Sequence, residues 1–279
     1  SLYSDRVTWF RNGHIVPILN KQLFNRELSV ICEEVYNLAP IINNELFNRH
    51  KVSGAISSAR RNLWRALEDN WELDDLGIEN DKWPAEKTIY HTLLKKTGIH
   101  QKQGEFYIIT RPNEDSGLID LWNASEGFLK EAQESKKNVS DLIEILSKRP
   151  YKLKQGVIDF WVPIFLFIRR GDFALFKDSG FVPYLNEQNL YMLTRNPKEY
   201  SLKSFELNSL RLTLFNKYRE FLKQESKDFI DTNSFIESIR PLLIFYRDLP
   251  DYSKITKTIS SEAIKLREAI SKAKDPEET

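Results

Sequence analysis

The stretch 148-KRPYKLKQGVIDFWVPIFLFIRRGDFALFKDSGFVPYL-185 decides the fold that this sequence predicts. Residues 157–168 are apolar apart from Asp159, and the run is far shorter than the roughly 20 residues of a membrane-spanning helix. We therefore predict a buried core helix over 157–168, which Pro163 should kink or start later along the chain. Asp178, Ser179 and Gly180 separate two short apolar runs, which indicates a β-hairpin.

An amphipathic segment precedes this stretch. Val139, Leu142 and Leu146 recur at helical spacing, and Asn138 or Ser140 can cap the helix. Two helices followed directly by a hairpin is the element order of a winged helix, in which the hairpin is the wing. We therefore predict a winged-helix-like unit over residues 138–185.

Most of the remaining chain is also helical by pattern. Asn12-Gly13 predicts an opening hairpin over 6–18, and Gly104 predicts another over 99–110. Apolar spacing predicts helices over 20–38, 53–70, 84–97, 117–135, 186–194, 210–222, 234–246 and 260–273. The predicted fold class is mainly α with small β-hairpins, a multi-helical array containing winged-helix-like units.

These elements predict four parts along the chain. They are an N-terminal hairpin and helical subdomain (1–80), a first winged-helix-like unit (81–116), a helix plus the second winged-helix-like unit (117–207) and a C-terminal helical subdomain (208–279). The acidic, aperiodic segment 71–83 is expected to be a linker. Cys32 lies on the apolar stripe of the helix over 20–38, so we expect it to be a small core residue.

Composition places the chain among ordinary globular proteins. It has 279 residues, 41% of them hydrophobic and 29% charged, and a net charge of +1. Any binding to nucleic acid must therefore come from local basic patches. A single cysteine excludes an internal disulfide and a cysteine-rich zinc site. The charged N-terminus is unlike a signal peptide, so we expect a cytoplasmic location; a first residue other than methionine suggests a piece of a longer protein.

Motifs for catalysis are missing from the sequence. It contains no phosphate-binding loop, no dinucleotide fingerprint and no G-x-S-x-G elbow. Its four histidines are scattered singly, without the spacing of a zinc protease. We therefore expect no autonomous active site, no metal site and no cofactor in this chain.

Basic side chains are the candidates for contact with phosphate or with a partner. They are Lys148, Arg149, Lys152, Lys154, Arg169 and Arg170 around the apolar helix, Arg60, Arg61 and Arg65 on the helix over 53–70, and Lys95, Lys96 and Lys102 near the hairpin over 99–110. The alternative for the three arginines is a solvated face near Glu68 and Asp69. Because the apolar helix offers almost no polar groups for reading bases, we favour protein contact over sequence-specific DNA binding, with non-specific phosphate contact between them.

Several segments together resemble a known kind of protein. They are 34-EVYNLAPIINNELFNRHKVSGAISSARRNL-63, 75-DLGIENDKWPAEKTIYHTLLKKTGIH-100, 148-KRPYKLKQGVIDFWVPIFLF-167, 174-ALFKDSGFVPYL-185 and 259-ISSEAIKLREAISKAKDPEE-278. The succession is similar to the region downstream of the ATPase core in large bacterial P-loop ATPases encoded among anti-phage defence genes. That pattern has glycine where Lys152 stands and proline where Asp159 stands.

The resemblance implies a non-catalytic part of a defence ATPase that couples nucleotide state to a partner. The partner would be the remainder of the ATPase, another protein subunit or nucleic acid bound without sequence preference, and not a membrane. Two alternatives remain: an independent nuclease whose metal site is built from scattered carboxylates, and a winged-helix DNA-binding protein.

Overall fold

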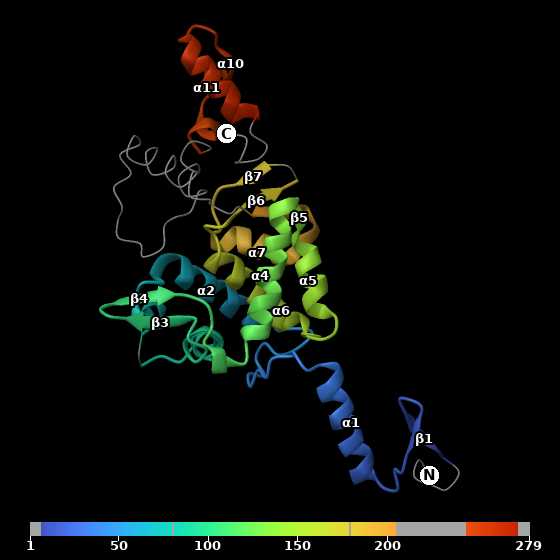
Figure 1. Cartoon of the computed structure of the whole chain (residues 1–279). Helices are drawn as coiled ribbons and strands as arrows, with labels where there is room; N and C mark the ends of the chain where they lie inside the picture. Colours follow the sequence, from blue (N-terminus) through green and yellow to red (C-terminus); the bar gives the residue numbers. More distant parts are fainter. Residues whose placement is uncertain (1–6, 80, 179, 205–243, 273–279) are drawn as a thin grey trace.

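The computed structural model describes residues 7–79, 81–178, 180–204 and 244–272. Helices dominate the described chain, and small antiparallel sheets accompany them, so the mainly-α prediction is confirmed (Figure 1). The helices are α1 (Lys21–Val35), α2 (Gly54–Asn70), α3 (Ala85–Tyr90), α4 (Ile119–Glu134), α5 (Val139–Ser147), α6 (Gln155–Ile168), α7 (Glu187–Arg195), α10 (Asp251–Ile255) and α11 (Ser261–Lys272). Shorter turns are η1 (Asp74–Gly77), the π-helical η2 (His91–Lys95), η3 (Glu114–Ser116) and η4 (Pro197–Glu199).

The helix starts follow their local sequence. The side chain of Ser53 accepts a hydrogen bond from the backbone N–H of Ile56 at the start of α2. Asn138 and Asp141 form a reciprocal capping box at the start of α5. Such caps satisfy backbone donors that the first turn leaves unpaired. Both helix starts were predictable because a cap needs only neighbouring residues.

Helix α6 is the centre of the core. Every residue of α6 is buried except Gln155, Asp159 and Ile168. The Trp161 Nε1–H donates to the hydroxyl of buried Ser125 on α4 at 3.0 Å. The predicted core helix is therefore confirmed. Its start is not displaced by Pro163, because α6 already begins at Gln155.

The strands form three sheets. They are β1 (Trp9–Arg11) with β2 (His14–Val16), β3 (His100–Gln103) with β4 (Phe106–Ile109), and a four-stranded sheet with the order β5 (Lys137–Asn138), β8 (Tyr200–Ser204), β6 (Phe173–Lys177) and β7 (Gly180–Val182). All three hairpins lie where the turn residues predicted them. The β6–β7 hairpin belongs to a larger sheet, because β8 pairs with β6 on one side and with β5 on the other. The assignment of winged-helix units and the four-part division stay predictions.

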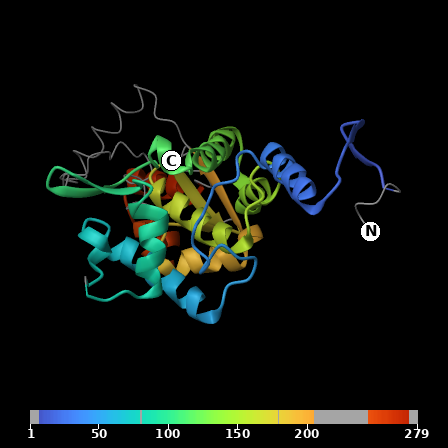
Figure 2. The ribbon, with the colours of Figure 1, turned by 90° about the horizontal axis from the view of Figure 1, so that it is seen from below.

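An N-terminal arm, formed by β1, β2 and α1, projects from the body of the molecule in both views (Figures 1 and 2). Although α1 carries an apolar stripe, none of its residues is buried. Cys32 is exposed, so its prediction as a core residue was wrong. The stripe identified a helix correctly, but its packing among the described residues leaves every side chain of α1 at least partly exposed. By contrast, one hydrophobic cluster links residues from Phe47 to Leu202.

The predicted linker over 71–83 and two predicted C-terminal helices have different outcomes. The segment 71–83, expected to be a linker, contains η1 with buried Asp75 and Leu76. The helix over 210–222 and most of the helix over 234–246 lie outside the described residues. Across those described residues, no helix is long and apolar enough to cross a membrane.

Candidate functional site

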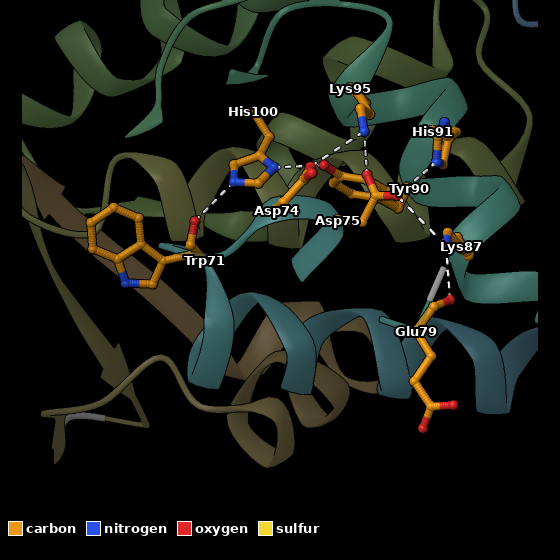
Figure 3. A network of polar contacts seen from close by, with 9 residues as sticks. All are labelled: Trp71, Asp74, Asp75, Glu79, Lys87, Tyr90, His91, Lys95 and His100. Atoms are coloured by element: carbon orange, nitrogen blue, oxygen red, sulfur yellow. Dashed lines mark hydrogen bonds and ion pairs between the residues drawn. The ribbon is translucent and has the colours of Figure 1, made fainter. Parts of the chain in front are cut away.

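A polar cluster around Asp75 begins at an unusual turn (Figure 3). Asp75, Leu76 and Gly77 have φ angles of 47°, 54° and 69°. This left-handed conformation costs roughly 1 to 2 kcal/mol for each residue other than glycine. Leu76 is buried in the core, and Asp75 is only 6% exposed. The surroundings must therefore hold the turn in place.

Three basic side chains surround the Asp75 carboxylate (Figure 3). Lys95 Nζ donates to Asp75 Oδ1, while Lys87 Nζ and His91 Nε2 lie 3.6 and 3.4 Å from Oδ2. Lys87 is 1% exposed and also donates to the carbonyl oxygen of Glu79 at 2.9 Å. Positions 87, 91 and 95 are four residues apart, so they share one face of a helix. We call Asp75, Lys87, His91 and Lys95 the Asp75 cluster.

The electrostatics of the Asp75 cluster favour an anchoring role. Burial alone raises the pKa of Asp75, but the hydrogen bond and charge of Lys95, together with His91, outweigh burial and leave that pKa below its ordinary value. The carboxylate is therefore ionised at neutral pH and is a poor proton donor there. Because cations occupy both oxygens, the cluster ties the left-handed turn to α3 and η2.

A second chain of hydrogen bonds lies beside the Asp75 cluster. The carbonyl oxygen of Trp71 can only accept, so His100 donates to it through Nε2 at 2.8 Å. His100 Nδ1 then accepts from the Tyr90 hydroxyl at 2.7 Å. Burial lowers the pKa of His100 and raises the pKa of Tyr90. At neutral pH the imidazole is therefore neutral and the phenol keeps its proton, which is the arrangement that these two bonds require.

The arginines of α2 are engaged within the protein. Arg60 is 4% exposed, and its Nη1 lies 2.7 Å from Asp159 Oδ2 on α6. The prediction that Arg60 contacts phosphate or a partner is therefore wrong, because a buried guanidinium paired with Asp159 cannot reach an external phosphate. Arg61 and Arg65 stay on the surface but both pair with Glu187 on α7, and the hydrogen bond from Arg61 lowers the pKa of Glu187.

The cations at the far end of α6 also have partners. Arg169 Nε lies 2.8 Å from Asp172 and 3.2 Å from Glu126. Arg170 donates to the carbonyl oxygen of Phe167 at 2.8 Å and lies over its ring. These two residues are separated by the length of α6, about 20 Å, from the loop that precedes the helix.

The predicted basic residues near the β3–β4 hairpin differ in the partners that they contact. Lys95 belongs to the Asp75 cluster. Lys96 follows η2 and is exposed, and Lys102 is exposed on β3 opposite Tyr107. The structure therefore does not gather these three into one surface with the residues around α6.

The loop between α5 and α6 does gather its cations. Lys148, Arg149, Lys152 and Lys154 are all exposed within it. Next to this loop lies a segment that the sequence analysis missed, with exposed Arg49, His50 and Lys51. Three consecutive basic residues are visible in the sequence as a possible binding segment. Their position beside the loop depends on contacts with Lys154 and Gly156, more than 90 residues later in the chain.

The arm presents apolar side chains to solvent. Phe10 and Ile15 face each other across the β1–β2 hairpin and are 66% and 68% exposed. The opposite face of the hairpin packs on α1: the rings of Trp9 and Phe24 lie 5.0 Å apart, and Arg11 lies 3.1 Å from Glu27. The arm is thus a small unit with one packed face and one apolar exposed face.

The described part of the chain contains no group of three or more His, Cys, Asp or Glu side chains that could hold a metal ion. Comparison of the chain with protein-family models, curated proteins and solved structures finds no match.

Proposed function

We propose that this chain is a non-catalytic interaction module of a larger bacterial defence-type ATPase, and that its N-terminal arm binds a protein partner. The observation that carries the proposal is the exposed apolar face of the arm. Phe10, Ile15 and Leu19 are each between 66% and 72% exposed, and α1 buries no residue. Exposed apolar patches of this kind mark interaction surfaces.

The arm is built to present that face. The Asn12-Gly13 turn has φ angles of 51° and 81°, which suit a tight hairpin, so Phe10 and Ile15 are set side by side. Arg11 holds the hairpin on α1 through Glu27 and Glu34. Covering each large apolar side chain would contribute about 1.5 to 3 kcal/mol to binding before ordering costs.

The proposed partner is the ATPase core or a subunit attached to it. In the proteins that this chain resembles, the ATPase core precedes the similar region. The chain departs from the pattern of those proteins at position 152, where that pattern has glycine. The φ of Lys152, 50°, lies in the region that favours glycine.

We also propose that α5, α6 and the β6–β7 hairpin act as a winged-helix-like packing unit. A DNA-reading helix needs polar side chains on an exposed face. Helix α6 buries nearly all of its residues, so its role in this proposal is structural.

The test starts from the polypeptide encoded immediately before Ser1, in which we expect a Walker motif. Calorimetry should show binding between that polypeptide and the full 279-residue chain. We expect Phe10→Ser with Ile15→Ser to weaken binding at least about tenfold, because two apolar contacts are lost.

Phe106→Ser is the matched control, since Phe106 on β4 is 67% exposed but lies outside the arm. It should leave the affinity unchanged. Three results would contradict the proposal: no binding, an equal loss in the control, or a dimer of this chain in light scattering that the arm variant dissociates. The last result would assign the arm to a second copy of the chain.

A further inference from the structure

Two basic segments meet at the start of α6. The backbone N–H of Gly156 donates to the carbonyl oxygen of Arg49 at 2.7 Å, and Lys154 Nζ donates to that of Asn48 at 3.1 Å. A Cβ atom at position 156 would lie 2.2 Å from the carbonyl oxygen of Phe47. Glycine therefore permits the close approach that brings residues 48–51 against the loop 148–154.

Every exposed residue of these two segments has a basic side chain. They are Arg49, His50, Lys51, Lys148, Arg149, Lys152 and Lys154, which we call the basic surface. Neither segment contains an acidic residue. In a chain with a net charge of only +1, this is a strong local concentration of positive charge.

The basic surface also differs from the other candidate cations in its pairing. Arg49, His50, Lys51 and Lys152 make no side-chain ion pair or hydrogen bond with any residue that the structure describes. Among the other three residues of the basic surface, Lys148 forms an ion pair with the carboxylate of Glu144. On α2, by comparison, Arg60 pairs with Asp159, and Arg61 and Arg65 share the carboxylate of Glu187.

The start of α6 adds to this charge. The helix is 14 residues long, and its first turn has no side-chain cap. The N-terminal end of a helix carries a partial positive charge. The peptide dipoles of α6 and the seven basic side chains therefore both favour the binding of an anion at the start of this helix.

We propose that the basic surface binds the phosphate backbone of nucleic acid without reading base sequence. Specific protein interfaces have an apolar centre, whereas the exposed residues of the basic surface are all basic. Nucleic-acid interfaces are polar and strongly positive. Flexible lysine and arginine side chains contact phosphates well, and phosphate contacts carry no sequence information.

This surface goes beyond the protein contact proposed for the arm and does not depend on it. The two proposals involve different residues and can fail separately. Arg49, His50 and Lys51 belong to it only because the fold places them beside residues 148–154.

The test is fluorescence anisotropy of the full chain with two labelled 20-base-pair duplexes of unrelated sequence, between 50 and 200 mM salt. We expect equal affinity for both duplexes and an affinity that falls linearly on logarithmic axes, with a slope of about −3 to −6. Arg49→Ala with Lys51→Ala should lower the affinity at 50 mM salt about tenfold or more. It should also reduce the steepness of the slope by about two, one unit for each lost phosphate contact.

A second variant, Lys51→Ala with Lys152→Asn, guards against a local folding defect, because asparagine tolerates the positive φ at position 152. We expect it to weaken binding to a similar extent, and circular dichroism should show both variants folded. Lys130→Ala with Lys198→Ala is the control: it removes the same charge from two exposed lysines elsewhere and should change the affinity less than twofold.

Three outcomes would overturn the proposal. They are no duplex binding at 50 mM salt, an equal loss in the Lys130 and Lys198 control, and binding to polyglutamate instead of the duplex. The last outcome would assign the basic surface to an acidic protein.

Discussion

Asp75 illustrates how a single residue holds a strained backbone in place. The left-handed turn at Asp75 and Leu76 is unfavourable by itself, and the turn persists because the carboxylate is surrounded by Lys87, His91 and Lys95. Removing the charge would leave Lys87 buried without its counter-charge. Uncompensated buried charges are strongly destabilising.

Asp75→Asn tests this role, because asparagine keeps the shape of the side chain and tolerates a positive φ. We expect the free energy of unfolding at pH 7 to fall by about 2 to 3 kcal/mol, measured by urea denaturation. Asp74→Asn is the control: this side chain is 59% exposed and contacts Lys95 and Tyr107 at the surface, so its loss should be below about 1 kcal/mol.

The same pair of variants predicts a pH dependence. The folded pKa of Asp75 lies below the ordinary value of 3.8 that we take for the unfolded chain. The stabilisation from the ionised carboxylate is therefore fully present above the unfolded value and is lost as pH falls through the lower folded pKa. The stability difference between the wild-type chain and Asp75→Asn should be constant from pH 7 to about pH 5 and shrink below pH 4. A difference that stays constant down to pH 2 would contradict this assignment.

Residue-scale features were the hardest to predict from sequence, because they depend on distant partners. Arg60 looked like one of three arginines on a solvated face, yet it is buried with Asp159, 99 positions away. Cys32 lies on an apolar stripe, but among the described residues the packing of that stripe buries none of its side chains. In both cases the local pattern identified the helix and left open what surrounds it.

At the scale of elements, Gly156 and Gly54 make a matched comparison, since both lie in the first turn of a helix. Alanine usually favours helices over glycine by about 0.5 to 1 kcal/mol. At position 156 its Cβ would lie 2.2 Å from the Phe47 carbonyl oxygen and 2.7 Å from that of Arg49. At position 54 nothing lies within 4 Å.

We therefore expect Gly156→Ala to lower the free energy of unfolding by about 1 to 3 kcal/mol, because overpacking forces the backbone to shift. Gly54→Ala should change it by less than about 0.5 kcal/mol or raise it slightly. Thermal and urea unfolding of the two variants would measure this. Equal effects would show that α6 does not need the close approach of the Asn48–Arg49 backbone.

Elements set by neighbouring residues were predictable, and elements set by distant pairing were not. Asn12-Gly13 located its hairpin, and Ser53 and Asn138 located their helix starts. The two-residue strand β5 was missed because it exists only through pairing with β8, some 60 residues later. The basic surface was half predicted for the same reason: residues 148–154 were visible as a group, but the contact with Arg49 was not.

For the whole molecule, a sealed core and exposed contact surfaces support binding over chemistry as the proposed role. We predict that the purified chain neither hydrolyses ATP nor cleaves DNA with Mg²⁺ or Mn²⁺. The sequence lacks a phosphate-binding loop. The described residues contain no group of three or more His, Cys, Asp or Glu side chains that could hold a metal ion. Phosphate release and plasmid nicking would be measured with the full chain, alongside a mock preparation that controls for contaminating enzymes. Metal-dependent cleavage that one carboxylate substitution in this chain abolishes would show instead that scattered acidic residues assemble a nuclease site.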